Sequence, residues 1–194
     1  LENRPDIEYE VLMSDNEDEI VEAAKDVHAI TVRTAKISSK VISNAANLLV
    51  VSRHGVGYDS IDLNTLSQKK IPLAIAANSN MTTVAEHTMM MMLALSKNVF
   101  YYDKFTRKAD WSIRWNNKSC DLAEKKLLVV GFGRIGSRVV KRAQAFDMQV
   151  FVYDPFVSKT LIEKSGSKTI SNLEDILPQI DIVTIHCPKN QNTE

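Results

Sequence analysis

The ten residues Leu127–Gly136, LLVVGFGRIG, place an apolar run directly before a G-x-G-x-x-G loop, and SRVVKRAQAF follows with helical spacing. A strand, a glycine-rich turn and a helix in this order are typical of the first βαβ unit of a dinucleotide-binding fold. Gly131 is expected to allow the tight turn, Gly133 to let backbone N–H groups approach a diphosphate, and Gly136 to let the helix pack closely on the strand.

The start of this helix is expected to face the anion. Its unpaired N–H groups, including those of Arg134 and Ile135, and its positive dipole end favour negative charge there. The glycine pattern alone is weak, because glycine-rich turns also serve ordinary loop geometry. The dinucleotide interpretation therefore depends on the residues that follow.

A second apolar run, Met148–Tyr153, ends at Asp154, at about the twenty-residue spacing that a ribose-binding acid has in such folds. A carboxylate there accepts hydrogen bonds from the adenosine ribose hydroxyls. No arginine occurs in residues 155–159, so a 2′-phosphate would meet a negative charge with a single lysine as partner. The sequence therefore predicts NAD rather than NADP as cofactor. The alternative is that Asp154 is an ordinary turn acid before Pro155.

Composition excludes several classes of protein. The chain has 24 basic and 24 acidic residues, and no basic stripe interleaved with aromatic residues, so nucleic acid is not an expected partner. The most apolar run, Met89–Leu95, is far too short to span a membrane, and no signal peptide opens the chain. Cys120 and Cys187 lie far apart without metal-ligand neighbours, which favours free thiols in the cytoplasm.

Strand-like and helix-like segments alternate along the chain, which predicts an α/β fold. In the first half, strands are expected at residues 7–12, 29–33, 48–52 and 71–76, and helices at 16–24, 38–46 and 61–70. In the second half, helices are expected at 82–105, 137–146, 158–164 and 172–177, and strands at 127–130, 148–153, 168–170 and 180–186. The domain boundary is placed near Asn80.

The two ends of the sequence suggest a fragment. The chain begins at Leu1 rather than at methionine and stops at Glu194, soon after the fourth strand of the second half. A doubly wound dinucleotide fold has two mononucleotide halves. We therefore expect a chain that is truncated at both ends or only partly represented.

Four motifs in order resemble the D-isomer-specific 2-hydroxyacid dehydrogenases, in particular those like D-3-phosphoglycerate dehydrogenase. They are SRHGVGYDSID (52–62), NSNMTTVAEHTMMMMLALSKN (78–98), VVGFGRIG with the later YDP (153–155), and DIVTIHCP (181–188). The resemblance implies a flavodoxin-like substrate-binding domain, of which residues 1–80 are the N-terminal part. It also implies a doubly wound Rossmann domain for NAD, of which residues 81–194 are the first part.

The loop that follows the expected strand at residues 48–52 is a candidate anion site. Gly55 and Gly57 flank Val56 and free backbone N–H groups to form a nest, and Arg53 adds positive charge beside His54. The resemblance implies that this loop holds the carboxylate of the substrate. The alternative is a tight strand-to-helix turn with glycines for geometry.

None of the four histidines is a convincing catalytic acid or base. From chemistry alone the best candidate is His186, at the carboxyl end of a strand. The resemblance instead implies that His186, Cys187 and Pro188 line the adenosine side of NAD, and that Val84 lies near the nicotinamide, although an ordinary core valine fits as well. The catalytic Arg, Glu and His of the family are expected beyond Glu194, so no catalytic residue is assigned in this chain.

The resemblance implies an enzyme that interconverts a D-2-hydroxy acid and a 2-oxo acid by hydride transfer with NAD. It also implies a homodimer, in which the apolar helix from Thr82 packs against a partner. Two alternatives stay open. One is an NAD(H)-sensing binding protein of the same architecture, similar to a transcriptional corepressor, and the other is a catalytically inert fragment.

Overall fold

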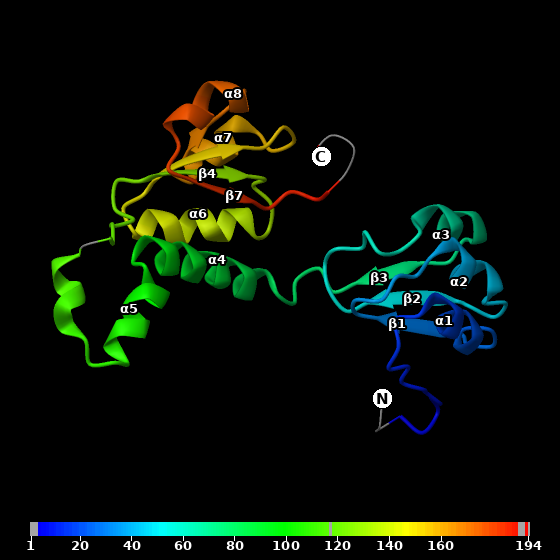
Figure 1. Ribbon diagram of the computed structural model, residues 1–194. Helices are drawn as coiled ribbons and strands as arrows, with labels where there is room; N and C mark the ends of the chain where they lie inside the picture. Colours follow the sequence, from blue (N-terminus) through cyan, green and yellow to red (C-terminus); the bar gives the residue numbers. More distant parts are fainter. Residues whose placement is uncertain (1–3, 117, 190–192, 194) are drawn as a thin grey trace. The chain divides into compact units, whose positions relative to one another are not determined.

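The computed structural model describes residues 4–116, 118–189 and 193, and its chain divides into two compact units, Leu1–Ser79 and Asn80–Glu194. Each unit has its own parallel sheet and its own hydrophobic core (Figure 1). Strands and helices alternate in both units, so the predicted α/β class is confirmed.

The sheet of the first unit has the strand order β1-β2-β3, and all its strands are parallel. The elements in chain order are α1 (Glu17–Ala23), β1 (Ala29–Val32), α2 (Ser39–Asn44), β2 (Val50–Arg53), α3 (Leu63–Lys69) and β3 (Leu73–Ile75). Val32 pairs with Arg53, and Arg53 pairs with Ile75. The loops that follow the three strands therefore begin at one edge of the sheet.

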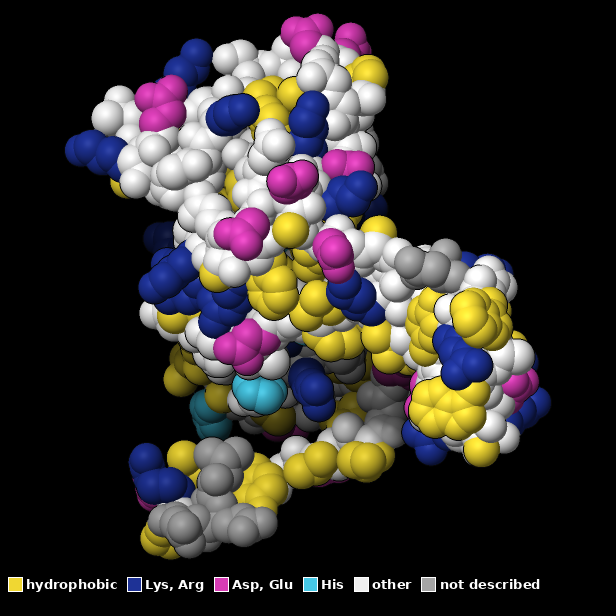
Figure 2. Space-filling model, turned by 90° about the vertical axis from the view of Figure 1, so that its left-hand side faces the viewer, with side chains coloured by type: hydrophobic (Ala, Val, Ile, Leu, Met, Phe, Trp, Pro, Cys, Tyr) yellow, Lys and Arg dark blue, Asp and Glu magenta, His cyan; other side chains and the backbone are white. Residues whose placement is uncertain are grey.

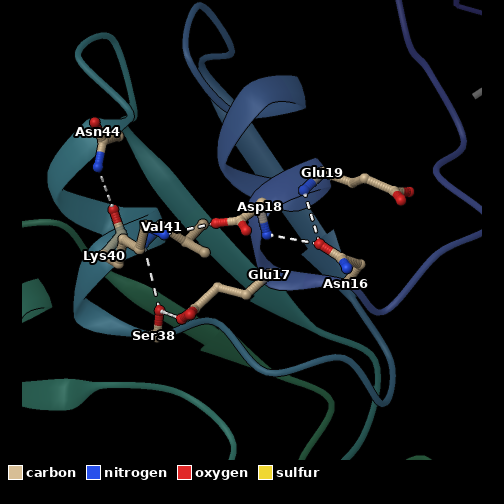
Figure 3. A network of polar contacts seen from close by, with 8 residues as sticks. All are labelled: Asn16, Glu17, Asp18, Glu19, Ser38, Lys40, Val41 and Asn44. Carbon is tan, nitrogen blue, oxygen red and sulfur yellow. Dashed lines mark hydrogen bonds and ion pairs between the residues drawn. The ribbon is translucent and has the colours of Figure 1, made fainter.

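A polar network fixes the first two helices of this unit to each other (Figure 3). The side chain of Asn16 caps α1 by accepting from the N–H of Asp18 at 2.9 Å. The Asp18 carboxylate in turn pairs with Lys40 of α2 at 2.6 Å, and the Ser38 hydroxyl donates to Glu17. These groups are exposed to solvent, so the pairs contribute little to stability and mainly set how the helices are placed.

The sheet of the second unit has the strand order β6-β5-β4-β7, again all parallel. The elements in chain order are α4 (Met81–Ser96), α5 (Val99–Thr106), the 3-10 helix η1 (Trp111–Trp115), β4 (Lys126–Val130), α6 (Gly136–Ala145), β5 (Gln149–Tyr153), α7 (Lys159–Lys164), β6 (Lys168–Thr169), α8 (Leu173–Ile176), the 3-10 helix η2 (Leu177–Gln179) and β7 (Ile182–Ile185). The order reverses between β4 and β7, and ligands of doubly wound sheets bind at such a point.

Alternation along β4 divides its side chains between two layers of helices. Leu127 and Val129 are fully buried with residues of α4, α6 and α7, whereas Leu128 packs with Phe151 and Ile176 on the opposite face. In Figure 1, α4 and α6 lie together on one side of this sheet and α8 on the other. Burial on both faces explains why residues 127–130 of this strand form an unbroken apolar run.

The strand predicted at residues 7–12 is wrong. This segment belongs to no strand, and Ile7, Tyr9 and Val11 are 37%, 47% and 67% exposed. Their alternation with glutamates fits a half-buried strand, but a strand also needs a neighbour for its backbone groups. Within the described residues, β1 pairs only with β2, so this segment has no such neighbour.

The single helix predicted at residues 82–105 is also wrong, because the structure has two helices there. Asn98 adopts a left-handed conformation with φ of 52° between α4 and α5. Asparagine tolerates this conformation better than most residues, so the apolar pattern continues while the helix direction changes. The remaining predicted strands and helices are confirmed, with ends that shift by a few residues.

Candidate functional site

Three adjacent strands of the second unit deliver the candidate cofactor residues to one edge of the sheet. Val130 of β4 lies opposite Tyr153 of β5 on one side and Ile185 of β7 on the other. The N–H of Gly131 donates to the carbonyl of Tyr153 at 2.9 Å, and the N–H of His186 donates to that of Val130 at 2.8 Å. Gly131, Asp154 and His186, which follow the three strands, are therefore brought together.

Two glycines of the loop are required by the fold itself. Gly131 has φ of +97°, and a Cβ added there would lie 2.8 Å from the backbone N of Cys187. A Cβ on Gly136 would lie 1.9 Å from the carbonyl oxygen of Gly131. The turn and the helix start can thus approach so closely only with glycine at both positions.

Gly133 differs, because a Cβ there would meet no atom within 4 Å. The fold therefore leaves open space beside this backbone. Space of this kind is what a diphosphate needs when it approaches the loop. The residues present fit a bound dinucleotide in this respect.

The helix that follows the loop begins with unused hydrogen-bond donors. Within the described residues, the N–H groups of Gly133, Arg134, Ile135 and Gly136 donate to no protein acceptor. They stand at the positive end of a ten-residue helix. An anion placed there gains both hydrogen bonds and the favourable field of the helix dipole.

Asp154 lies directly after β5 and is half-buried. Its Oδ2 accepts from the N–H of Phe132 at 2.7 Å, and its Oδ1 accepts from those of Phe156 and Val157 at 2.8 and 3.1 Å. Burial by itself raises the pKa of this carboxyl, but the three N–H donors outweigh it and hold the pKa below its ordinary value. Asp154 therefore stays negatively charged, as a ribose ligand that discriminates against a 2′-phosphate must.

His186 is half-buried beside the loop, and its Nε2 lies 2.9 Å from the Thr184 hydroxyl. Burial lowers the pKa of this imidazole, so the ring is neutral at pH 7. Cys187 is also half-buried, with its backbone against Gly131, whereas Pro188 is exposed. Among the described residues, no carboxylate is hydrogen-bonded to His186 to orient its ring.

The candidate substrate loop belongs to the first unit and begins at the end of β2. The Arg53 guanidinium folds back over it, with Nη1 donating to the His54 carbonyl at 2.7 Å. The N–H of Gly55 donates to the Arg53 carbonyl at 2.8 Å, whereas the N–H groups of Val56 and Gly57 have no acceptor among the described residues. The free donors of the loop are thus the N–H groups of Val56 and Gly57, and not that of Gly55.

Sequence analysis did not single out Arg33, a cation at the carboxyl edge of the first unit's sheet. Arg33 is exposed directly after β1, and its neighbour Val32 pairs with Arg53. Arg33 directly follows β1 and Arg53 ends β2, so the two arginines lie at the carboxyl ends of neighbouring parallel strands. The signal that could have found it is the presence of Arg at the carboxyl ends of two successive predicted strands.

Val84 is half-buried in the first turn of α4, where its N–H donates to the Asn80 carbonyl at 2.9 Å. Its own carbonyl accepts from the Thr88 hydroxyl at 2.8 Å. These are ordinary helix contacts.

No helix in the described part of the chain is both long and apolar enough to cross a membrane. Among residues 4–116, 118–189 and 193, no three side chains of His, Cys, Asp or Glu are grouped so that they could hold a metal ion.

The chain is similar in sequence and in fold to several known dehydrogenases. The chain is 35% identical over 96% of its length to the D-3-phosphoglycerate dehydrogenase of Methanocaldococcus jannaschii, and covers 36% of that protein. It is similar to the D-lactate dehydrogenase of Aquifex aeolicus solved with NAD and lactic acid, with a TM-score of 0.81 and 29% identity over 89% of this chain and 51% of that one. A third match is the NAD-dependent formate dehydrogenase of Staphylococcus aureus solved with NAD, with a TM-score of 0.80 and 28% identity over 93% of this chain and 54% of that one.

The chain thus spans about a third of the length of the phosphoglycerate dehydrogenase that it matches. Residues 89–194, more than half of the chain, match the family described as D-isomer specific 2-hydroxyacid dehydrogenase, NAD binding domain. This range contains the turn after β4, its free amides and Asp154. The chain belongs to the D-isomer specific 2-hydroxyacid dehydrogenase family, and its second unit is of the NAD-binding type.

Proposed function

We propose that this chain is part of an NAD-dependent dehydrogenase that interconverts a D-2-hydroxy acid and a 2-oxo acid. The observation that supports this most is the set of free N–H groups at the start of α6, next to the charged Asp154, in a member of this family. When bound, NAD supplies hydride transfer to or from the substrate carbon. The relatives are named as enzymes, which favours a dehydrogenase over an NAD-sensing protein.

The proposed contacts with the diphosphate and the ribose are based on the geometry of the second unit, and the other cofactor contacts are based on the resemblance to the family. The N–H groups from Gly133 to Gly136 would bind the diphosphate, with the exposed Arg134 side chain as a further cation. Asp154 would accept from the adenosine ribose. His186, Cys187 and Pro188 would line the adenosine side, and Val84 would border the nicotinamide.

The first unit is proposed as the substrate-binding part, with a boundary at residues 80–81. The free N–H groups of Val56 and Gly57, together with the Arg53 guanidinium, would bind the substrate carboxylate. The exposed Arg33 offers a second positive charge to a substrate with another anionic group. No described side chain is assigned the proton-transfer role, because the four histidines lack an orienting carboxylate.

Initial rates of the full-length protein test this function. With a panel of D-2-hydroxy acids and their 2-oxo counterparts, we expect turnover with NAD(H) and a preference for NAD over NADP of at least about tenfold in kcat/KM. This preference corresponds to about 1.4 kcal/mol of discrimination at Asp154. Absence of turnover across the panel despite NADH binding would support the sensor instead, and a preference for NADP would contradict the role of Asp154.

Gly55→Val tests the substrate loop. An added side chain would meet the Arg53 Nη1, which a Cβ alone approaches to 2.9 Å, and would displace the guanidinium. We expect the KM of the 2-hydroxy acid to rise about tenfold, which is the loss of roughly one charge-assisted hydrogen bond. The KM of NAD should stay unchanged as an internal control. An unchanged KM for the acid would contradict the assignment.

We also propose a homodimer that forms through α4 and α6. An apolar groove of about 590 Å³ runs along these helices and α5, and the exposed Met90 and Phe100 are among its residues. Hydrophobic side chains gather among charged ones on the face shown in Figure 2. The groove has one acid, Glu86, and one base, Arg142, which pair at 3.1 Å. A second copy therefore meets no excess of like charge at a two-fold interface.

Light scattering on the purified full-length protein tests the dimer. We expect twice the chain mass for the wild type and for Leu161→Glu, which changes an exposed apolar residue of α7 outside the groove. Phe100→Glu should give monomers, because it places two charges in the apolar interface. A monomeric wild type at micromolar concentration, or a dimer in Phe100→Glu, would contradict this interface.

A cytoplasmic location is proposed from the thiols. Cys120 is exposed and Cys187 is half-buried, and both are free. Free thiols persist in a reducing compartment. This agrees with an enzyme that uses the cytoplasmic NAD pool.

A further inference from the structure

The carboxylate of Asp154 is bonded to the glycine-rich loop itself. Its Oδ2 accepts from the N–H of Phe132, which lies between Gly131 and Gly133, at 2.7 Å. Its Oδ1 accepts from the N–H groups of Phe156 and Val157. One side chain therefore joins the turn after β4 to the turn after β5.

These bonds divide the donors of the loop into two groups. The N–H of Gly131 is held by the Tyr153 carbonyl at 2.9 Å and that of Phe132 by Asp154, so the first part of the loop is anchored to β5. The N–H groups from Gly133 to Gly136 are left free within the described residues. A glycine-rich loop that is not anchored must be ordered when a ligand binds, and that ordering weakens the observed affinity.

We propose that Asp154 is a positioning residue for the diphosphate, in addition to being a ribose ligand. Through the amide of Phe132 it holds the loop in the conformation that presents the free N–H groups of Gly133–Gly136. This inference rests on the proposed nucleotide site. If Asp154 holds the loop in this way, it also strengthens the binding of diphosphate ligands that have no ribose hydroxyls.

The two roles predict different effects of removing Asp154 on the affinity for a diphosphate. Asp154 is negatively charged, so it repels a nearby diphosphate. If Asp154 served only the ribose, its removal would leave the affinity for a diphosphate without ribose hydroxyls unchanged or would strengthen it. If it positions the loop, its removal weakens that affinity despite the lost repulsion.

Two ligands and two variants separate these roles in the full-length protein. ADP has the ribose hydroxyls, and 2′,3′-dideoxy-ADP lacks both but keeps the diphosphate and the adenine. Asp154→Ala removes every contact of the carboxylate. Asp154→Asn keeps one oxygen for the turn at Phe156 and Val157, but its amide nitrogen cannot accept from Phe132. Dissociation constants are obtained by displacement of NADH.

We expect dideoxy-ADP to bind both variants about tenfold more weakly than the wild type, which is the effect of one charge-assisted hydrogen bond. ADP should lose more, because it loses the ribose contact as well. Affinity for dideoxy-ADP that is unchanged or increased in the variants would overturn the positioning role. So would failure of dideoxy-ADP to displace NADH from the wild type. A wild type that binds no NADH would overturn the proposed function itself.

Amide deuterium exchange gives a second readout that is independent of ligand. In Asp154→Asn the N–H of Phe132 should exchange at least about fivefold faster, while the amides inside β4 keep their protection. Unchanged exchange at Phe132 would contradict the contact on which the proposal depends. This measurement also decides the question if Asp154→Ala fails to fold.

Discussion

Gly136→Ala is expected to lower the free energy of unfolding of the second unit by about 3 kcal/mol or more. The added methyl group would lie 1.9 Å from the carbonyl oxygen of Gly131 and 3.0 Å from its carbonyl carbon. Both are backbone atoms, so the clash is relieved only if the helix start and the turn move apart. Thermal unfolding should show a decrease of roughly 6–12 °C in Tm.

The matched control is Gly133→Ala in the same loop. Its Cβ meets nothing within 4 Å, so we expect a Tm within about 2 °C of the wild type. Equal decreases in the Tm of Gly133→Ala and Gly136→Ala would mean that glycine is needed at both positions only for backbone flexibility. A wild-type Tm in Gly136→Ala would contradict the close approach of α6 to the turn.

Gly133→Val has the second large expected effect, on binding rather than on folding. Its side chain would enter the open space beside the free N–H groups of Arg134 and Ile135 and would exclude the diphosphate from them. Loss of two charge-assisted hydrogen bonds of about 1.5 kcal/mol each weakens NADH binding roughly a hundredfold. Calorimetry measures the dissociation constant, and the Tm of the second unit checks the fold.

Two results for Gly133→Val would contradict this prediction. Wild-type affinity for NADH in Gly133→Val would show that the diphosphate does not approach this backbone. A large loss of stability would show that the space beside Gly133 is needed by the protein rather than by a ligand.

The site in the second unit could be predicted largely from local sequence. A strand, a glycine-rich turn and a helix follow each other directly, so Gly131, Gly133 and Gly136 fall where the pattern implies. Asp154 could be placed because it follows an apolar run long enough for a neighbouring parallel strand. These inferences need only the order of elements and the rule that parallel strands end at one edge of the sheet.

Contacts between distant residues could not be predicted in this way. The bond from Phe132 to Asp154 joins residues of two different turns, and the turn of Arg53 over its own loop depends on a side-chain conformation. The absence of a strand at residues 7–12 has a similar cause, because the pattern cannot show whether a neighbouring strand exists. The break at Asn98 depends on one backbone conformation within a continuous apolar pattern.

Titration calorimetry of the full-length protein with NADH tests the central claim, that the turn after β4 binds a dinucleotide diphosphate. We expect one site per chain with a dissociation constant in the micromolar range, about −8 kcal/mol, and binding roughly a hundredfold weaker in Gly133→Val. No heat of binding with the wild type at millimolar NADH would contradict the account.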